Sequence, residues 1–392
     1  MRTQNIVLTL AAMVTGIFVL AVGMVLLWPL FNSSPFQVRD HEVMVFNNDN
    51  GPFEEFEAIA PNRQGADERH VAPAELPNLR GAAVPAKDYA LSGPHTHSNL
   101  SIFLIHGADT LKETKILTLQ EALENNVATV HETGQGRLFI DNRGNAPLFI
   151  QSGDIVKGGT QDRVLPYDML LSANTKRAPI TALCVEQGRS FPRGNELSSS
   201  FQTATEQLPG RDLRLAAYRE NQSEVWSNVR ALQTNLARNA GGSVQAAQSQ
   251  TSLQMSLEHQ RVQDAVQDCL VNLAPTPAGK KDVIGYAVVV NGKIQSADVY
   301  ASNSLFQKLW PKLIRASAVG ALAERQPGAV INPPSTETVR AFLTDAERGE
   351  AFQVQGNTRS TVIRQQTAQH LLFDTCDPAK QNIVLHRTFL AR

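Results

Sequence analysis

The chain has 392 residues, enough for two or three domains, and carries a formal net charge of -1. Its hydrophobic content of 42% and charged content of 19% are typical of a folded protein and exclude a disordered one. The near-zero net charge excludes a global positive field, so we expect no nucleic-acid partner.

An uninterrupted apolar segment begins the chain. There is no charged residue between Thr3 and Val38, and residues 6–28 are almost wholly apolar. A helix of about 23 residues is roughly 34 Å long, enough to cross a lipid bilayer. A cleaved secretory signal is the alternative, but its apolar region is usually shorter and precedes a small-residue cleavage site. We therefore predict a transmembrane anchor at 1–31 that enters the lipid bilayer through residues 6–28.

The orientation of this anchor rests on few charges. Arg2 precedes the span and Arg39 follows it, so the count of basic residues is equal on the two sides. A short inner terminus with the body of the protein outside is the simpler topology. We predict a single-pass membrane protein whose main domain lies on the extracytoplasmic side.

Residues 32–97 have the composition of a proline-rich tether. Prolines recur among glycine, alanine, asparagine and charged residues, which prevents a continuous helix or central strand. A short strand at 41–46 could interrupt it.

A β-rich segment begins at residue 98. Short runs of β-forming residues separated by turn signals are typical of an antiparallel sandwich or a barrel-like sheet. Thr118 and Glu121 form a capping-box pattern that opens a short helix at 117–124. The other runs predict strands at 99–105, 127–132, 136–140, 147–151, 164–171 and 180–186.

Residues 214–274 have a helical period instead. Two apolar stripes recur at spacings of 4, 3 and 4 residues, and a Gly241-Gly242 pair lies between them. We predict a long helical hairpin. The stripes are Val225, Val229, Leu232 and Leu236, and Val262, Val266, Cys269 and Leu273.

The C-terminal part returns to strands. Asn291-Gly292 between two β-rich runs at 282–290 and 293–300 predicts a type I′ hairpin. A helix from Ser304 follows, then a short helix at 336–346 and four short strands up to residue 386. We therefore predict an α+β domain at 98–392: a β-sandwich-like antiparallel sheet with an inserted long helical hairpin, preceded by one N-terminal transmembrane helix.

The motif GGTQDR at 158–163 is the strongest candidate for a binding site. Adjacent glycines allow positive φ, so their amides can point at an anion. Arg163 could then clamp a phosphate or carboxylate, with Asp162 or Glu186 holding its guanidinium. The alternative is a structural turn in which Asp162 and Arg163 pair with each other. The sequence leaves both open.

Histidine and cysteine patterns are less informative. His95 and His97 lie in an H-x-H pattern, but no third ligand has a defined spacing, so we assign no metal. Cys184, Cys269 and Cys376 form no C-x-x-C pair, and we interpret them as buried thiols, with one disulfide possible in an oxidising compartment.

Motifs at several separated places share one pattern. They lie at 117–123, 130–132, 141–142, 147–150, 153–154, 158–163, 184–186, 188–189, 225–226, 285, 291–292, 304–306 and 310–313. Together they resemble a bacterial family named for its association with ADP-ribosylglycohydrolases and rhodanese-phosphatase proteins. The resemblance covers about 99–390 and implies a domain of unassigned activity. The family name suggests ADP-ribose or nucleotide-linked metabolism.

Three functions follow as hypotheses. The first is binding of a small anionic or nucleotide-like ligand. The second is hydrolysis of such a compound, for example of the ADP-ribose type, with Glu186 or Asp162 as general base. The third is a non-catalytic scaffold that binds a protein partner through the helical hairpin. Catalysis and cofactor stay open, and the predicted ligand-binding residues are Gly158, Gly159, Gln161, Asp162, Arg163, Glu186 and Arg189.

Overall fold

The structure is a computed structural model in which residues 69–70, 83–111, 115–133, 136–193, 196, 200–355 and 359–392 are described. The predicted transmembrane anchor at 1–31 and the strand at 41–46 lie outside these residues. Within the described ranges, no helix is both long and apolar enough to cross a membrane.

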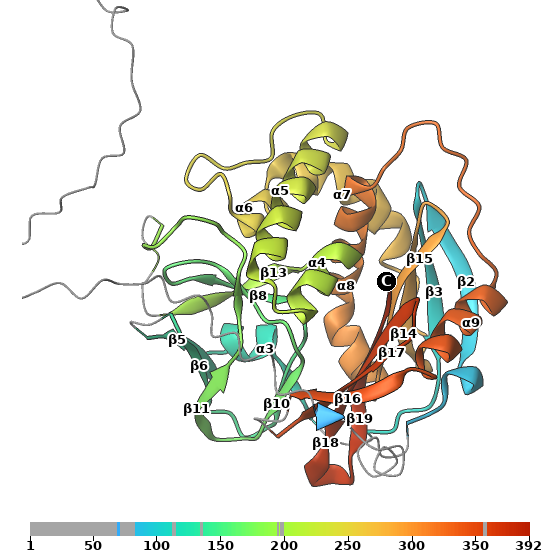
Figure 1. Cartoon of the computed structure of the whole chain (residues 1–392), viewed down its shortest axis with the longest axis horizontal. Coiled ribbons are helices and arrows are strands. Elements are labelled where there is room, and N and C mark those ends of the chain that lie inside the picture. Colours follow the sequence, from blue (N-terminus) through green and yellow to red (C-terminus); the bar gives the residue numbers. More distant parts are fainter. Residues whose placement is uncertain are drawn as a thin grey trace, which may run out of the picture. The chain divides into compact units, whose positions relative to one another are not determined.

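A nine-stranded antiparallel sheet is the centre of the fold (Figure 1). The strand order is β1-β16-β17-β18-β19-β15-β14-β3-β2. The predicted hairpin joins β14 and β15, and Asn291 and Gly292 have φ values of 50° and 76°, as a type I′ turn requires. The strands are β1 (Arg69–His70), β2 (Ala90–His97), β3 (Leu100–His106), β14 (Val283–Val290), β15 (Lys293–Tyr300), β16 (Glu350–Gln355), β17 (Thr361–Gln366), β18 (His370–Asp377) and β19 (Ile383–Ala391).

Helices cover both faces of this sheet, which explains why β14 is buried along its whole length. Side chains alternate between faces along a strand. Tyr286 and Val288 therefore face α8 (Asn303–Ala323), whereas Ala287 and Val289 face α9 (Thr336–Ala346). Because a helix packs on each face, no side of β14 is exposed to water, and its side chains can be apolar along the whole strand.

The predicted helical region is confirmed, with a different arrangement of its helices. It forms α4 (Arg211–Tyr218), α5 (Gln222–Asn239), α6 (Leu253–Leu257) and α7 (Gln260–Leu273). Both predicted stripes are buried in the core cluster that contains α8, except Cys269, which is partly buried. Asn239 of α5 donates to the Leu322 carbonyl of α8, and Trp310 of α8 donates to the Ala274 carbonyl that ends α7. The two long helices therefore pack on α8 and do not stand apart as a separate hairpin.

Residues 117–207 form what we call the small lobe, which contains three short sheets in place of the predicted sandwich. The nine-stranded sheet and the helices on its two faces form what we call the large lobe. The predicted strands at 164–171 and 180–186 are each interrupted. The capping box of α3 (Leu119–Glu124) is confirmed, with Thr118 and Glu121 each bonding the other's backbone N–H. The strands are β4 (Leu117–Thr118), β5 (Ala128–Glu132), β6 (Leu138–Asn142), β7 (Leu148–Ile150), β8 (Asp154–Gly158), β9 (Arg163–Val164), β10 (Met169–Leu171), β11 (Thr175–Ile180), β12 (Leu183–Cys184) and β13 (Phe201–Gln207).

The folded domain begins before residue 98, where the sequence placed its start. The end of the predicted tether forms a short 3-10 helix, η1 (Ala86–Asp88), and the edge strand β2. Arg387 donates to the Val84 carbonyl at 3.0 Å, and Glu347 accepts from the Ala86 N–H at 3.0 Å. Pro94 made β2 look like a linker, but an edge strand tolerates proline, and the β2–β3 register shifts at that point.

Candidate functional site

The GGTQDR motif forms a tight connection between β8 and β9. Gly158 ends β8 with φ of 122°, and Gly159 follows with φ of 54°. A Cβ atom on Gly159 would lie 2.7 Å from Glu132 Oε2 and would also overlap the Phe201 ring. Glycine is therefore required here for close packing as well as for backbone conformation.

The loop's carboxylates are buried and paired. Asp162 accepts from both terminal nitrogens of Arg193, at 2.7 and 2.9 Å, and from Ser252 Oγ at 3.1 Å. Glu186 accepts from Arg189 Nε at 2.6 Å. Neither carboxylate has exposed surface. Ion pairs this deeply buried are costly to break, because removing one partner leaves a buried charge.

Arg163 has a different partner from the one that the structural-turn hypothesis assigned to it. Its Nη2 donates to Glu132 Oε1 at 2.8 Å, and its Nη1 donates to Gln161 Oε1 at 2.8 Å. Gln161 in turn donates to the Arg189 carbonyl. Asp162 pairs with Arg193, as above. Interpreting the loop as a structural turn thus gains support, although the Asp162–Arg163 pair itself is wrong.

All seven predicted site residues are therefore close together, and their charged groups hold the loop. Burial raises the pKa of Asp162 above its usual range, against the opposing effect of Arg193. A ligand could reach Asp162 or Glu186, the two candidate general bases, only if this network opened. None of the seven residues lines the cleft beside α4 (Arg211–Tyr218) that is described below. Their role in ligand binding stays a prediction.

The predicted H-x-H pair lies on the edge strand β2. Burial, followed by the nearby Lys280, lowers the pKa of His95. In the part of the chain that the structure describes, no three histidine, cysteine, aspartate or glutamate side chains are grouped to hold a metal ion. The cysteines form no disulfide there: Cys376 is buried, and Cys184 and Cys269 are partly buried.

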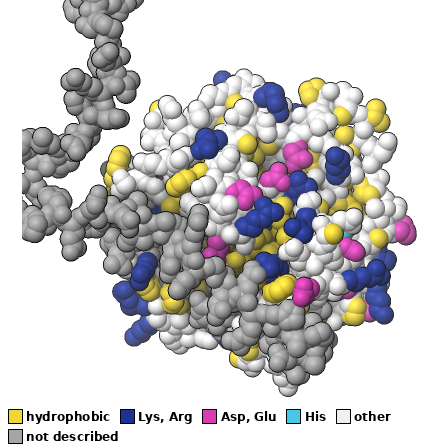
Figure 2. All heavy atoms as spheres, viewed as in Figure 1, with side chains coloured by type: hydrophobic (Ala, Val, Ile, Leu, Met, Phe, Trp, Pro, Cys, Tyr) yellow, Lys and Arg dark blue, Asp and Glu magenta, His cyan; other side chains and the backbone are white. Residues whose placement is uncertain are grey.

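A cleft lies between the small lobe and the face of the sheet covered by α8. The space inside it, open solvent included, is ≈ 490 Å³. Figure 2 shows basic and acidic side chains gathered around apolar ones in the region where Figure 1 labels α4. The lining residues are Gln151, Gln207, Leu208, Gly210, Arg211, Arg214, Tyr286, Val288, Val290, Gln295, Ser296, Leu313, Ala316, Ser317, Gly320 and Glu324.

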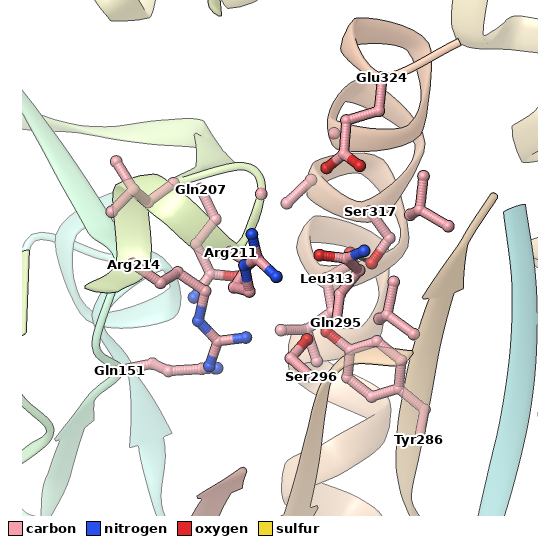
Figure 3. A pocket seen from close by; sticks show the side chains of 16 residues that line it. Gln151, Gln207, Arg211, Arg214, Tyr286, Gln295, Ser296, Leu313, Ser317 and Glu324 are labelled. Atoms are coloured by element: carbon pink, nitrogen blue, oxygen red, sulfur yellow. Dashed lines mark hydrogen bonds between the residues drawn. The ribbon is translucent and has the colours of Figure 1, made fainter. Parts of the chain in front are cut away.

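The N-terminus of α4 opens on this cleft. Its N-cap, Gly210, has φ of 76° and no side chain that could bond the N–H groups of the first turn. A Cβ atom on Gly320 of α8 would lie 3.2 Å from the Gly210 nitrogen, so the close approach of the two helices depends on glycine. Arg211 follows directly, and its side chain enters the cleft (Figure 3).

The second arginine of the cleft is fixed by a buried carboxylate. Arg214 donates to the two oxygens of Asp298 at 2.8 and 3.1 Å. Thr388 also donates to Asp298 at 3.0 Å. Burial alone would raise the pKa of Asp298, but Arg214 and then His386 outweigh burial and hold that pKa well below its usual range.

His386 extends these charges to the small lobe. Its Nδ1 lies 2.7 Å from Asp168 Oδ2, and its Nε2 lies 3.2 Å from Asp298 Oδ1 without the alignment of a hydrogen bond. Burial lowers the pKa of His386, but Asp168 and Asp298 more than offset this effect and raise the pKa to about 9. Asp168 also accepts from the Ser152 N–H at 2.7 Å. A protonated imidazole therefore links the two lobes behind the cleft.

The sequence did not identify the residues of this cleft. Gln151, Arg214 and Tyr286 come from three distant segments and form no local pattern. The one available signal is Gly210-Arg211, where a glycine precedes a helix that opens with a basic residue. These polar residues are far apart in the sequence, and they line one cleft only because the fold brings their segments together.

Comparison with protein-family models identifies a family whose model covers most of the chain. The sequence model of the ARG and Rhodanese-Phosphatase-superfamily-associated Protein domain matches residues 88–390. This range starts at the end of η1 and contains the small lobe, helices α4 to α9 and every residue of the cleft. No curated protein and no solved structure matches the chain.

Proposed function

The chain belongs to the ARG and Rhodanese-Phosphatase-superfamily-associated Protein domain family, and from that premise we propose that it binds a small anionic ligand between its lobes. The observation that carries this proposal is the N-terminus of α4, which opens on the cleft beside Arg211 and Arg214. Helix N-termini attract anions because their first N–H groups lack intrahelical partners and the helix dipole is positive there.

Arg211 is the cation that can turn to a ligand. Within the described residues Arg211 forms an ion pair with Asp212, whose side chain is 68% exposed, and exposed pairs of this kind contribute little. The Arg211 charge also acts on Glu324, which lines the same cleft. Arg214, by contrast, is held by Asp298. We therefore assign the variable contact to Arg211 and a fixed, orienting contact to Arg214.

Substitution of Arg211 tests this assignment. Arg211→Gln removes one charge-assisted hydrogen bond, worth about 1.5–3 kcal/mol, so we expect affinity for inorganic phosphate to fall roughly tenfold or more. Isothermal titration calorimetry and the shift in thermal unfolding temperature measure the loss. Arg219→Gln is the matched control, since Arg219 ends the same helix, pairs with Glu224 and lies outside the cleft. Equal phosphate binding by wild type and Arg211→Gln would contradict the proposal.

We also propose that the domain is tethered to a lipid bilayer through residues 6–28, with its body on the extracytoplasmic side. The support is the length and apolar character of that segment, as given above. The full chain should stay in the membrane fraction after an alkaline carbonate wash, and a chain lacking 1–31 should not. Protease added to spheroplasts, whose cell wall or outer membrane has been opened while the inner membrane stays sealed, should digest the domain. Release of the full chain by the wash, or full protection from protease, would refute the anchor or its orientation respectively.

A further inference from the structure

One buried oxygen in the lining of the cleft lacks a hydrogen-bond donor within the described residues. Gln151 follows β7 and is 1% exposed, and its Oε1 has no hydrogen-bond partner among the described residues. A buried acceptor without a donor costs about 1–3 kcal/mol, and such groups are rare in folded proteins. The position of this residue in the lining of the cleft connects the unsatisfied atom with a ligand.

The rest of the Gln151 side chain is firmly held. Its Nε2 donates to the Tyr300 hydroxyl at 2.9 Å, and its backbone N–H donates to Asp154 Oδ2 at 3.0 Å. Tyr300 is itself stacked on the His386 ring, with centroids 4.4 Å apart. With the amide in this orientation, one N–H donates to the Tyr300 hydroxyl and the oxygen is left without a donor.

The position of Gln151 relative to the arginines separates two kinds of contact. In Figure 3 its side chain points across the lower part of the cleft toward Ser296 and Tyr286, whereas Arg211 lies higher, on the other side of Arg214. A ligand whose anionic group lies at the N-terminus of α4 would therefore extend a different group to Gln151. Because Oε1 is an acceptor, that group must be a donor.

From this geometry we infer that the ligand is a hydroxylated anion, such as a sugar phosphate or sugar acid, with its anionic group at Arg211 and a hydroxyl donor at Gln151. The hydroxyl supplies the hydrogen bond that Gln151 Oε1 lacks, and the neighbouring Ser296 hydroxyl and Gln295 amide add further polar surface. The inference rests on the proposed anion site and adds the second half of the ligand to it.

The test compares ribose 5-phosphate, gluconate, inorganic phosphate and free ribose by titration calorimetry against the whole protein. We expect wild type to bind ribose 5-phosphate or gluconate at least tenfold more tightly than inorganic phosphate. Gln151→Met keeps the length of the side chain and removes the acceptor, so it should lose that tenfold gain and leave phosphate binding within twofold of wild type. Tyr300→Phe removes the same internal hydrogen bond but keeps the Gln151 oxygen, so it should retain the gain.

The possible failures are distinguishable. If wild type binds phosphate but neither hydroxylated anion more tightly, the inference is wrong and the anion site stands; this comparison needs no variant to fold. If Gln151→Met weakens phosphate and the hydroxylated anions equally, Gln151 only shapes the cleft and the inference is again wrong. If none of the three anions binds, both proposals are overturned. If free ribose binds tightly and none of the anions does, both proposals are also overturned, because binding would then not depend on an anionic group.

Discussion

Asp298 lies where three elements of the fold meet: α4 through Arg214, β19 through His386 and Thr388, and its own strand β15. Its burial is complete, and so is that of His386. Two carboxylates, Asp168 and Asp298, flank one imidazolium, and Arg214 balances the second carboxylate. Each charge is therefore tolerable only because the next one is present.

The raised pKa of His386 makes stability depend on pH. The folded-state pKa of about 9 exceeds the ordinary 6.5, so protonation contributes stability that is fully present below about pH 6.5 and is lost as pH rises through 9. Wild type should lose about 2–3 kcal/mol of unfolding free energy between pH 6 and 9.5 that His386→Gln does not lose. Urea unfolding at a series of pH values measures the difference.

Glu206 requires a control in this experiment. Burial raises its pKa to about 7, so its own contribution falls as pH rises from 4.5 through 7 and is shared by both proteins. The difference between wild type and His386→Gln therefore isolates the imidazole. His131→Gln, at a side chain that is 36% exposed, should follow wild type. Parallel curves for wild type and His386→Gln would disprove a charged His386.

At the scale of secondary-structure elements, glycine determines how closely strands and helices approach. Gly285 of β14 has an unremarkable φ, yet a Cβ atom there would lie 2.9 Å from Val299 Cα of the neighbouring strand and would overlap the Asp298 carbonyl. Both obstacles are backbone atoms, which cannot move without disturbing the pairing of β14 with β15. The pairing of β14 with β15 thus requires a residue without a side chain at position 285.

Two glycine substitutions separate backbone from side-chain obstacles. Gly285→Ala should destabilise the protein by about 1–3 kcal/mol, because overpacking forces the strands apart. Gly107→Ala is the matched control: its Cβ would meet the flexible end of Ile284, at 2.5 Å, so we expect a cost below about 1 kcal/mol. Chemical denaturation followed by circular dichroism measures both. An equal loss of stability in both variants would show that the backbones of β14 and β15 can move apart as easily as the Ile284 side chain can move.

At the scale of the molecule, basic residues on α8 join the two lobes. Lys308 pairs with Glu121 at 3.0 Å in a partly exposed position, and Lys312 pairs with Asp154 at 2.7 Å with both side chains at most 5% exposed. Because Asp154 also accepts from the Gln151 N–H, the Lys312 pair helps to fix the base of the cleft. The two lobes are therefore joined by ion pairs, and the contribution of each pair to stability depends on how deeply it is buried.

Lys312→Met and Lys308→Met compare a buried and an exposed pair on one helix. Lys312→Met leaves Asp154 charged and buried, so we expect a loss of about 3–5 kcal/mol, against less than about 1 kcal/mol for Lys308→Met. The double variant Lys312→Met with Asp154→Leu should recover most of the loss, since it removes both charges. Urea unfolding measures stability, and amide hydrogen exchange in residues 117–207 shows whether the small lobe opens first. A loss of similar size in both single variants would argue against burial as the cause.

The sequence by itself determined the features that depend on neighbours along the chain. The capping box of α3, the Asn291-Gly292 hairpin and the apolar stripes of α5 and α7 all follow from local conformational preference and periodicity. The edge strand β2 and the interrupted strands of the small lobe did not, because proline and short strands give the same pattern as a linker or one longer strand.

Only the tertiary structure decided which charges meet. The residues of the GGTQDR loop were predicted to gather, and they do, but Asp162 pairs with Arg193 and not with its neighbour Arg163. The cleft joins Gln151 to Arg214 across segments with no common pattern. Pairing and cavity formation depend on distances between segments that the topology brings together, and local sequence carries no record of those distances.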